Sequence, residues 1–172
     1  MYALTPENQE MKQYKILSVQ WDELPMCLEC VKAAFTVMAD KYKYSKESYP
    51  SSAAYLTLED LQKAKAQSVH MYAVWMDGKI VGYVQLEKKP EGVYSFQRFA
   101  VHPDYQSHGF GRALVAFCKN KATVYGGKKI RLLMINENDS LKKFYISCGF
   151  KECYIGTDDA HPFEFAILEM EL

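Results

Sequence analysis

The sequence predicts a single α+β domain whose central sheet is mixed, mostly antiparallel and flanked by helices. Its 172 residues, about half of them apolar, are enough for one buried core. Three strand-like segments follow one another in the middle of the chain, and Asp77-Gly78 joins the first two as a hairpin turn. Segments with the apolar spacing of helices stand before and after them. Together these observations predict an antiparallel meander covered by helices.

The first third of the chain is expected to hold one strand and two helices. Residues 14–21 form the strand-like segment. A stripe of apolar residues at intervals of three and four predicts a long helix, with Asp22 as its N-cap: Leu24, Leu28, Val31, Phe35 and Met38. A loop with four tyrosines follows over residues 39–55. Thr57, three residues before Asp60, is the expected cap of a short second helix.

The rest of the chain is expected to alternate between strands and helices. The segments are, in order, strands over 70–76, 79–89 and 92–102, a helix to about residue 124, a strand over 130–135, a helix over 139–148, and strands over 150–157 and 163–172. The short strand over 130–135 is almost continuously apolar, as expected of a buried strand. Gly149 is the expected end of the last helix.

Composition and charge narrow the setting in which the protein works. The formal net charge is zero and no block of like charges occurs, so neither nucleic acid nor a membrane surface is an expected partner. The first ten residues lack the apolar core of a signal peptide, and no apolar run is long enough to span a membrane. We therefore expect a cytoplasmic protein, with residues 1–13 as a flexible lead-in and residues 14–172 as its one domain.

The five cysteines are expected to be free thiols, because their number is odd and no secretory signal precedes them. Cys27 and Cys30 have the spacing of a zinc or redox motif, but no second pair follows and both lie within the predicted first helix. We therefore expect structural side chains there and no metal site.

The turn before the helix that ends near residue 124 contains Gly109 and Gly111. Such a turn can bind an anion, because free backbone N–H groups converge there with the positive end of the helix dipole. The alternative is that the glycines only allow a tight turn. Two nucleotide-binding motifs are absent, since no P-loop occurs and Leu114 stands where a third glycine would complete the dinucleotide motif.

Two motifs resemble those of the GNAT superfamily of N-acetyltransferases. Residues 106–111, QSHGFG, match its signature Q/R-x-x-G-x-G/A, and the preceding RFAVHPDY looks like the exit of the family's fourth strand. Residues 138–150, NDSLKKFYISCGF, resemble its second motif, N-x-x-(S/A)-x-x-x-Y-x-x-x-G-F. The resemblance covers roughly residues 70–156. It implies the GNAT-like acyl-CoA N-acyltransferase fold and the transfer of an acetyl group from acetyl-CoA to an amine.

The resemblance also implies which residues bind the acetyl donor. The glycine turn would hold the pyrophosphate through backbone N–H groups, with the Arg112 side chain as a supporting charge; its residues are Gln106, Ser107, His108, Gly109, Phe110, Gly111 and Arg112. The backbone of Phe99, Ala100 and Val101 would pair with the pantetheine arm, and a free N–H there would polarise the thioester carbonyl. Asn138 would hydrogen-bond the amide region of the cofactor. The resemblance implies no metal.

Tyr145, in the second motif, is the expected catalytic residue. After the amine attacks the thioester, the leaving thiolate needs a proton, and a phenol with a pKa of about 10 can supply it at little cost. The alternative is that Tyr145 only packs beside Phe144.

No general base can be assigned from the sequence. Many relatives carry a Glu on the fourth or fifth strand, but the matching positions here hold Ser95, Gln97 and Leu133. The open candidates lie near strand ends: Glu87, His102, His161 and Glu164. A water chain to backbone carbonyls, or an amine with a lowered pKa, would need no base at all.

The acceptor amine is expected near two loops. The tyrosines of residues 36–57 could line a cleft, and Asp158 and Asp159 could attract a cation; the tyrosines are Tyr42, Tyr44, Tyr49 and Tyr55. All of these could equally be solvated loop residues.

Other functions stay open on the sequence alone. The acceptor is expected to be a small-molecule amine, with an exposed protein amine as the alternative. A non-catalytic acetyl-CoA sensor and a protein-interaction domain with a purely structural glycine turn are the rival hypotheses. Relatives are often dimers, so a homodimer is compatible with the resemblance.

Overall fold

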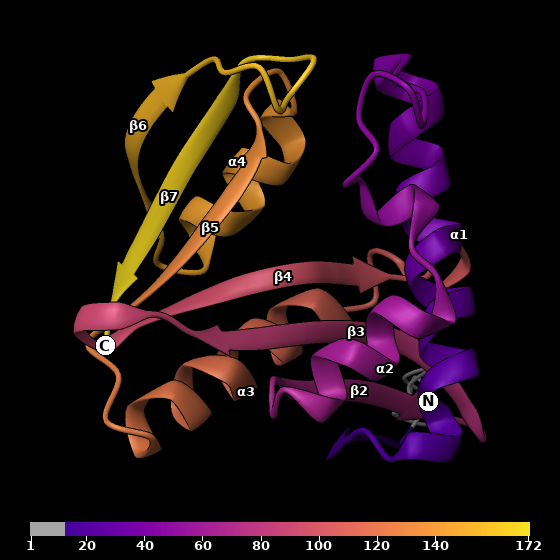
Figure 1. The fold of residues 1–172 in the computed structure, drawn as a ribbon. Coiled ribbons are helices and arrows are strands. Elements are labelled where there is room, and N and C mark those ends of the chain that lie inside the picture. Colours follow the sequence, from indigo (N-terminus) through magenta and orange to yellow (C-terminus); the bar gives the residue numbers. More distant parts are fainter. Residues whose placement is uncertain (1–12) are drawn as a thin grey trace, which may run out of the picture.

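The computed structural model describes residues 13–172 as one seven-stranded sheet with helices packed against it (Figure 1). The predicted lead-in over residues 1–13 therefore lies outside the described residues, except for its last position. No helix in the described range is long and apolar enough to cross a membrane.

The sheet has the strand order β1-β2-β3-β4-β5-β7-β6. Its strands are β1 (Tyr14–Ser18), β2 (His70–Met76), β3 (Lys79–Lys88), β4 (Val93–Val101), β5 (Lys129–Ile135), β6 (Lys151–Gly156) and β7 (Phe165–Glu171). All neighbours are antiparallel except β4 and β5, which are parallel. The prediction of a mixed, mostly antiparallel sheet is confirmed.

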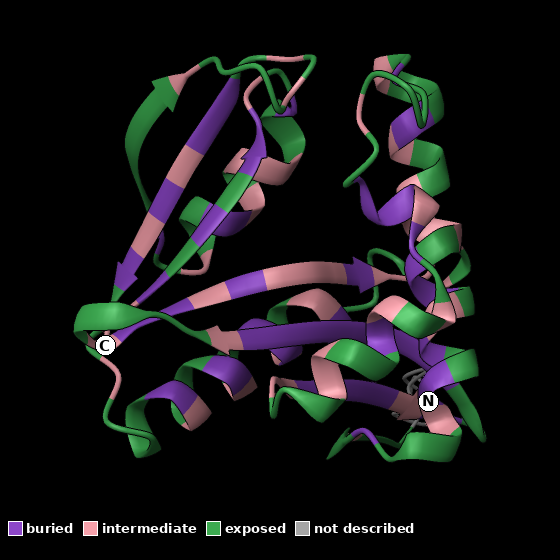
Figure 2. Cartoon of the chain, viewed as in Figure 1, coloured by how far each residue is buried: buried purple, intermediate pink, exposed green. Residues whose placement is uncertain are grey.

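Helices cover both faces of the sheet. They are α1 (Leu24–Tyr42), α2 (Leu58–Ala66), α3 (Phe110–Val124) and α4 (Asp139–Ser147). Helices α1 and α2 pack on one face of β2–β4, whereas α3 and α4 enclose the larger core on the opposite face. Figure 2 shows β3 buried over most of its length, as expected of a strand covered on both faces, whereas buried and exposed residues alternate along the helices.

Two of the predicted local signals are confirmed. Asp77 and Gly78 both have a positive φ, 51° and 74°, as a type I′ hairpin turn requires, and they join β2 to β3. At the start of α2, Thr57 Oγ1 accepts from the Asp60 N–H at 3.2 Å, and the Asp60 carboxylate accepts from the Thr57 N–H at 2.9 Å. This reciprocal pair is a capping box.

The predicted N-cap of the long helix is wrong, although the helix begins at Leu24, the first residue of the predicted stripe. Strand β1 ends at Ser18, and a 3₁₀ turn over Trp21–Glu23 precedes α1, so that Asp22 lies inside this turn and caps nothing. The turn is closed by the Gln20 N–H, which donates to the Glu23 carboxylate at 2.8 Å. Pro25 then stands in the first turn of α1, where its missing N–H is not needed.

The sheet opens between β4 and β5. Only Val93–Ser95 pair with Lys129–Arg131, and beyond this point the two strands diverge (Figure 1). The register of β4 against β3 shifts in the same region, and Arg98 has a φ of +53°, which marks a β-bulge. A bulge bends and twists its strand, so it accounts for the divergence of β4 from β5.

The cysteines of the predicted zinc or redox spacing both lie buried in α1. Burial raises the pKa of the Cys27 and Cys30 thiols to about 12, which keeps them protonated and unreactive. Within residues 13–172, no group of three or more His, Cys, Asp or Glu residues could hold a metal ion.

Candidate active site

Two cavities meet where β4 and β5 diverge. The first, of about 650 Å³, lies at the N-terminus of α3 and is called the α3 cavity here. The second, of about 550 Å³, lies beside β5 and is called the β5 cavity. Both are lined by the same five residues: Phe35, Met38, Phe99, Leu141 and Tyr145. A molecule bound in one cavity therefore faces a molecule bound in the other across these side chains.

The two glycines of the α3 turn serve different purposes. Gly109 is the N-cap of α3 and has a φ of +85°, a conformation that other residues adopt only with strain. Gly111 has an ordinary φ, but a Cβ there would stand 3.2 Å from Cζ of Phe144. The first glycine sets the turn, and the second allows α4 to pack against the start of α3.

The α3 cavity has the chemistry of an anion site. The first backbone N–H groups of α3 have no partner within the helix and carry the positive end of its dipole. Lys41 and Arg112 add positive charge to the lining, and no Asp or Glu of the described residues lines the cavity. The remaining walls are largely apolar, so the cavity suits a ligand with an anionic end and a long apolar or amide arm.

Ten of the eleven residues predicted to bind the donor line the α3 cavity; these are Phe99, Ala100, Val101, Gln106, Ser107, Gly109, Phe110, Gly111, Arg112 and Asn138. The exception is His108, which is exposed and whose Nδ1 lies 2.7 Å from the Gln106 carbonyl oxygen. The Gln106 side chain donates to the Val101 carbonyl at 3.0 Å and so ties the glycine turn to the end of β4.

Arg112, whose charge was predicted to support the pyrophosphate, already donates hydrogen bonds to Ser147. Its guanidinium donates to Ser147 Oγ at 2.8 Å and to the Ser147 carbonyl at 3.4 Å, at the C-terminal end of α4. It also lies over the Phe144 ring, 5.9 Å from the centroid. Arg112 is exposed and keeps further N–H groups, so it can contribute charge to the cavity from this fixed position.

Asn138 is buried and caps α4. Its Oδ1 accepts from the Leu141 N–H at 3.3 Å and from Ser140 Oγ at 3.1 Å, while its Nδ2 lies 3.8 Å from the Met38 sulfur. The amide N–H groups are therefore the part of Asn138 left for a ligand. Leu141 stands where the family motif has Ser or Ala, and it lines both cavities.

The edge of β4 that faces β5 lacks a strand partner from Phe96 to Val101 among the described residues. Ala100 pairs with Tyr83 on the other side, so backbone groups on the open edge are free to pair with an extended ligand. Sequence reasoning missed the cause of this opening, the left-handed bulge at Arg98, because nothing marks a bulge at a non-glycine residue.

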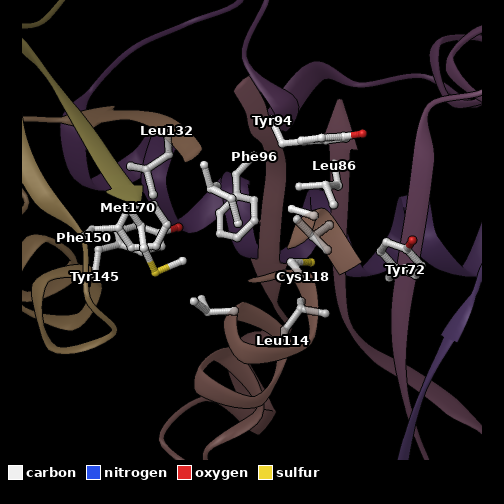
Figure 3. Close-up of a cluster of buried hydrophobic side chains, with 14 of the residues drawn as sticks. Tyr72, Leu86, Tyr94, Phe96, Leu114, Cys118, Leu132, Tyr145, Phe150 and Met170 are labelled. Atoms are coloured by element: carbon white, nitrogen blue, oxygen red, sulfur yellow. The ribbon is translucent and has the colours of Figure 1, made fainter. Parts of the chain in front are cut away.

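Tyr145 sits at the junction of the cavities. The residue is 5% exposed, and its ring packs edge-on against Phe99 and Phe150, with centroids 5.8 and 5.4 Å away. Figure 3 shows Tyr145 beside Phe150 in the core. Its hydroxyl makes no hydrogen bond to any residue in the described range. Burial, with a smaller contribution from Cys148, raises the pKa of Tyr145 above its usual value of about 10. The structure therefore presents a neutral phenol with an unused proton.

The β5 cavity contains the residues that replace the usual strand carboxylates. Gln97 donates to Ser95 Oγ at 3.0 Å, and Leu133 is 42% exposed on β5. No Asp or Glu of residues 13–172 lines this cavity, although Arg98, Arg131 and His161 do. Of the four predicted loop tyrosines, Tyr44 and Tyr49 line the cavity, whereas Tyr42 and Tyr55 do not.

Only one of the open candidates for the general base reaches either cavity. Glu87 pairs with Lys89 at 2.8 Å and Glu164 accepts from Asn136 at 2.5 Å, both away from the cavities. His102 accepts from the Asp104 N–H at 3.2 Å and so caps a 3₁₀ turn. His161 lines the β5 cavity, and its Nδ1 lies 2.7 Å from Asp158 Oδ1.

Comparison with known proteins agrees with this geometry. The family model described as "Acetyltransferase (GNAT) domain" matches residues 67–152, half of the chain. A search of curated proteins finds no significant match.

Solved structures of N-acetyltransferases share the fold at low identity. The PaiA N-acetyltransferase from Thermoplasma acidophilum, in complex with coenzyme A, has a TM-score of 0.77 at 20% identity, covering 93% of this chain and 99% of that one. The ribosomal-protein-S18-alanine N-acetyltransferase from Escherichia coli has a TM-score of 0.73 at 18% identity, covering 92% and 94%. A spermidine N-acetyltransferase chimera from Vibrio cholerae and hSSAT has a TM-score of 0.70 at 18% identity, covering 92% and 95%. With the family model, the two motifs and the opened sheet in agreement, the chain belongs to the GNAT acetyltransferase family.

Proposed function

We propose that this protein is an acetyl-CoA-dependent N-acetyltransferase that acetylates a small-molecule amine, with Tyr145 as the proton donor to the leaving thiolate. The observation that carries the proposal is the position of Tyr145, which lines both an anion-binding cavity and a second cavity without acidic residues. Donor and acceptor would occupy the two cavities and meet beside its hydroxyl.

The α3 cavity fits the acetyl donor. The N-terminus of α3 offers several N–H groups to a pyrophosphate, which a single glycine turn without a helix would not supply. The open edge of β4 offers backbone groups to the amides of a pantetheine arm, and Asn138 lines the same cavity. An N–H on this edge would also polarise the thioester carbonyl as negative charge develops on its oxygen.

Tyr145 is suited to the final proton transfer. The amine nitrogen attacks the thioester carbon, the carbon–sulfur bond breaks, and the thiolate takes the proton of the Tyr145 hydroxyl. Burial raises the pKa of the phenol, but it acts in the same direction on a thiol in these surroundings. Proton transfer to a thiolate that forms in the same apolar surroundings therefore costs less than the raised pKa of the phenol alone would imply.

The lining of the β5 cavity favours a monoamine that carries an apolar or aromatic part. Aromatic side chains form much of its wall: Phe35, Tyr44, Tyr49, Phe96, Phe99 and Phe163. Of the charged residues in the lining, Arg131 pairs with Glu169 at 2.5 Å and Arg98 donates to Gln85 Oε1 at 2.8 Å. No described carboxylate lines the cavity to hold a second ammonium group. A polyamine would have to bury a charge without a partner, which is unfavourable.

The proposal is tested by calorimetry with acetyl-CoA, followed by thiol release in the presence of a panel of amines. We expect acetyl-CoA to bind, and aromatic or aliphatic monoamines to be acetylated faster than spermidine. Failure of acetyl-CoA to bind would overturn the proposal. Binding without turnover of any amine would favour the sensor, which the lack of a carboxylate in the β5 cavity could also explain.

A further inference from the structure

His161 lines the β5 cavity and is held there by contacts on several sides. It lies in the turn before β7, and its side chain is 17% exposed. The ring packs among three aromatic side chains, with centroid distances of 5.4 Å to Tyr49, 5.6 Å to Phe163 and 5.2 Å to Phe165. These contacts fix the plane of the imidazole and hold it against the cavity.

Asp158 fixes the tautomer of this imidazole. Its Oδ1 lies 2.7 Å from His161 Nδ1 and also accepts the backbone N–H groups of Ala160 and His161, both at 3.0 Å. A carboxylate only accepts hydrogen bonds, so in the neutral imidazole Nδ1 is the nitrogen that carries the proton and Nε2 the one with a free lone pair. The hydrogen bond from His161 lowers the pKa of Asp158, which keeps the carboxylate ionised in neutral solution.

No other described residue lining the β5 cavity can take up a proton near neutral pH. Arg98 and Arg131 stay protonated, and serine and glutamine side chains are not bases at this pH. Burial raises the pKa values of Tyr44 and Tyr49, so their hydroxyls stay neutral. The charged and titratable groups that face His161 are Asp158 on its own turn and Tyr49 on the loop opposite.

We propose that His161, oriented by Asp158, is the general base that removes the proton from the acceptor amine. When the amine nitrogen bonds to the thioester carbon, its extra proton passes to His161 Nε2, directly or through one water molecule. The carbon–sulfur bond then breaks and the thiolate takes the Tyr145 proton. His161 releases its proton to solvent and Tyr145 is reprotonated, so the balance is one amide and one free thiol. This inference rests on the proposed function and names the base that the strand positions do not provide.

The variant His161→Gln tests this assignment, because glutamine can hydrogen-bond but cannot take up the proton. With an amine that the wild-type protein acetylates, kcat/KM at pH 7 should fall on the order of 10²–10⁴-fold. The wild-type pH profile should contain an acid limb, on which activity falls as the base is protonated, and this limb should disappear in the variant. Acetyl-CoA affinity should be unchanged, because His161 lines the β5 cavity and not the α3 cavity.

Asp158→Asn and His70→Gln complete the test. Asp158→Asn removes the carboxylate that orients His161, so kcat should fall while acetyl-CoA affinity stays unchanged. His70 stacks on Tyr125 at 4.4 Å and lines neither cavity, so its variant should retain the wild-type profile. If the wild-type protein acetylates an amine and His161→Gln keeps both rate and limb, this inference is wrong and the proposed function stands. If the wild-type protein acetylates no amine, both are wrong.

Discussion

The two cavities of this protein differ in what they are made of. The α3 cavity takes its anion-binding chemistry from the backbone at the start of one helix, within a continuous stretch of sequence. The β5 cavity takes its chemistry from side chains of α1, the following loop, β4, β5 and the turn before β7. Binding by backbone N–H groups depends little on which side chains surround them. Binding by side chains depends on their identity, so a substitution can change which ligand is bound.

This difference explains why the proposed donor site could be predicted in more detail than the proposed acceptor site. A diphosphate requires several N–H groups at once, and only a few local sequences supply them. An amine can be bound in many ways. Tyr145 lines both cavities. Substitutions at Tyr145, in the α3 cavity and in the β5 cavity therefore test whether the two cavities have separate functions.

The largest effect is expected for Tyr145→Phe. Loss of the hydroxyl removes the proton donor but keeps the ring that packs on Phe99 and Phe150. We expect kcat to fall on the order of 10²–10⁴-fold with acetyl-CoA affinity unchanged, measured by thiol release and calorimetry. Tyr42→Phe is the matched control, since the Tyr42 hydroxyl has no hydrogen-bond partner in the described range and lines neither cavity. An unchanged kcat for Tyr145→Phe would remove Tyr145 from its proposed role.

A smaller effect is expected for Gly109→Ala, and it should be confined to the donor side. A left-handed conformation costs a non-glycine residue roughly 1–2 kcal/mol, and relaxation of the turn would redirect the N–H groups of α3. We expect acetyl-CoA affinity to fall on the order of tenfold, measured by calorimetry.

Gly126→Ala is the control for this strain. Gly126 also has a positive φ, +77°, and like Gly109 has space for a Cβ, but it follows the C-terminal end of α3. Both variants should lose a similar amount of thermal stability, and only Gly109→Ala should lose affinity. Equal affinity in the two variants would show that the glycine turn is purely structural.

The sequence allowed the sheet, the helices and the turn before α3 to be predicted, because each depends on local signals. That this turn binds acetyl-CoA stays a prediction. Asp77-Gly78 and Thr57 with Asp60 are examples in which the pattern and the backbone agree. The prediction of Asp22 as an N-cap was wrong because a 3₁₀ turn precedes α1. A turn of three residues is too short to show in the spacing of apolar residues.

The acceptor side could not be predicted in the same way. Phe35 and Met38 fit the stripe expected of a core helix, and their place between the cavities depends on the bulge at Arg98. His161 could be named only as one of several residues near strand ends. Its contact with Tyr49 joins segments more than a hundred residues apart, which no local pattern reports.

A several-fold effect on acceptor preference is expected for Leu133→Glu. Leu133 is 42% exposed on β5 and lines the β5 cavity, so a carboxylate can be placed there without burial. A partly exposed ion pair is worth about 0.2–1 kcal/mol, which should lower KM for a diamine by about 1.4–5-fold. Leu133→Gln has nearly the same shape without the charge and should leave KM unchanged. If both variants behave alike, charge in this cavity does not select the acceptor.

The smallest effect concerns the titration of Asp158. The hydrogen bond from His161 lowers the pKa of this carboxyl below its usual value of about 3.9. Because the folded pKa is the lower one, the stabilisation is present above the unfolded pKa and is lost as pH falls through the folded pKa. His161→Gln should therefore raise the Asp158 pKa toward its usual value, measured by NMR of the side-chain carboxyl. Asp60, whose pKa is lowered by its hydrogen bonds with Thr57, should titrate as before. An unchanged pKa of Asp158 would mean that the pair does not persist in solution, and the proposed base would then lose the contact that orients it.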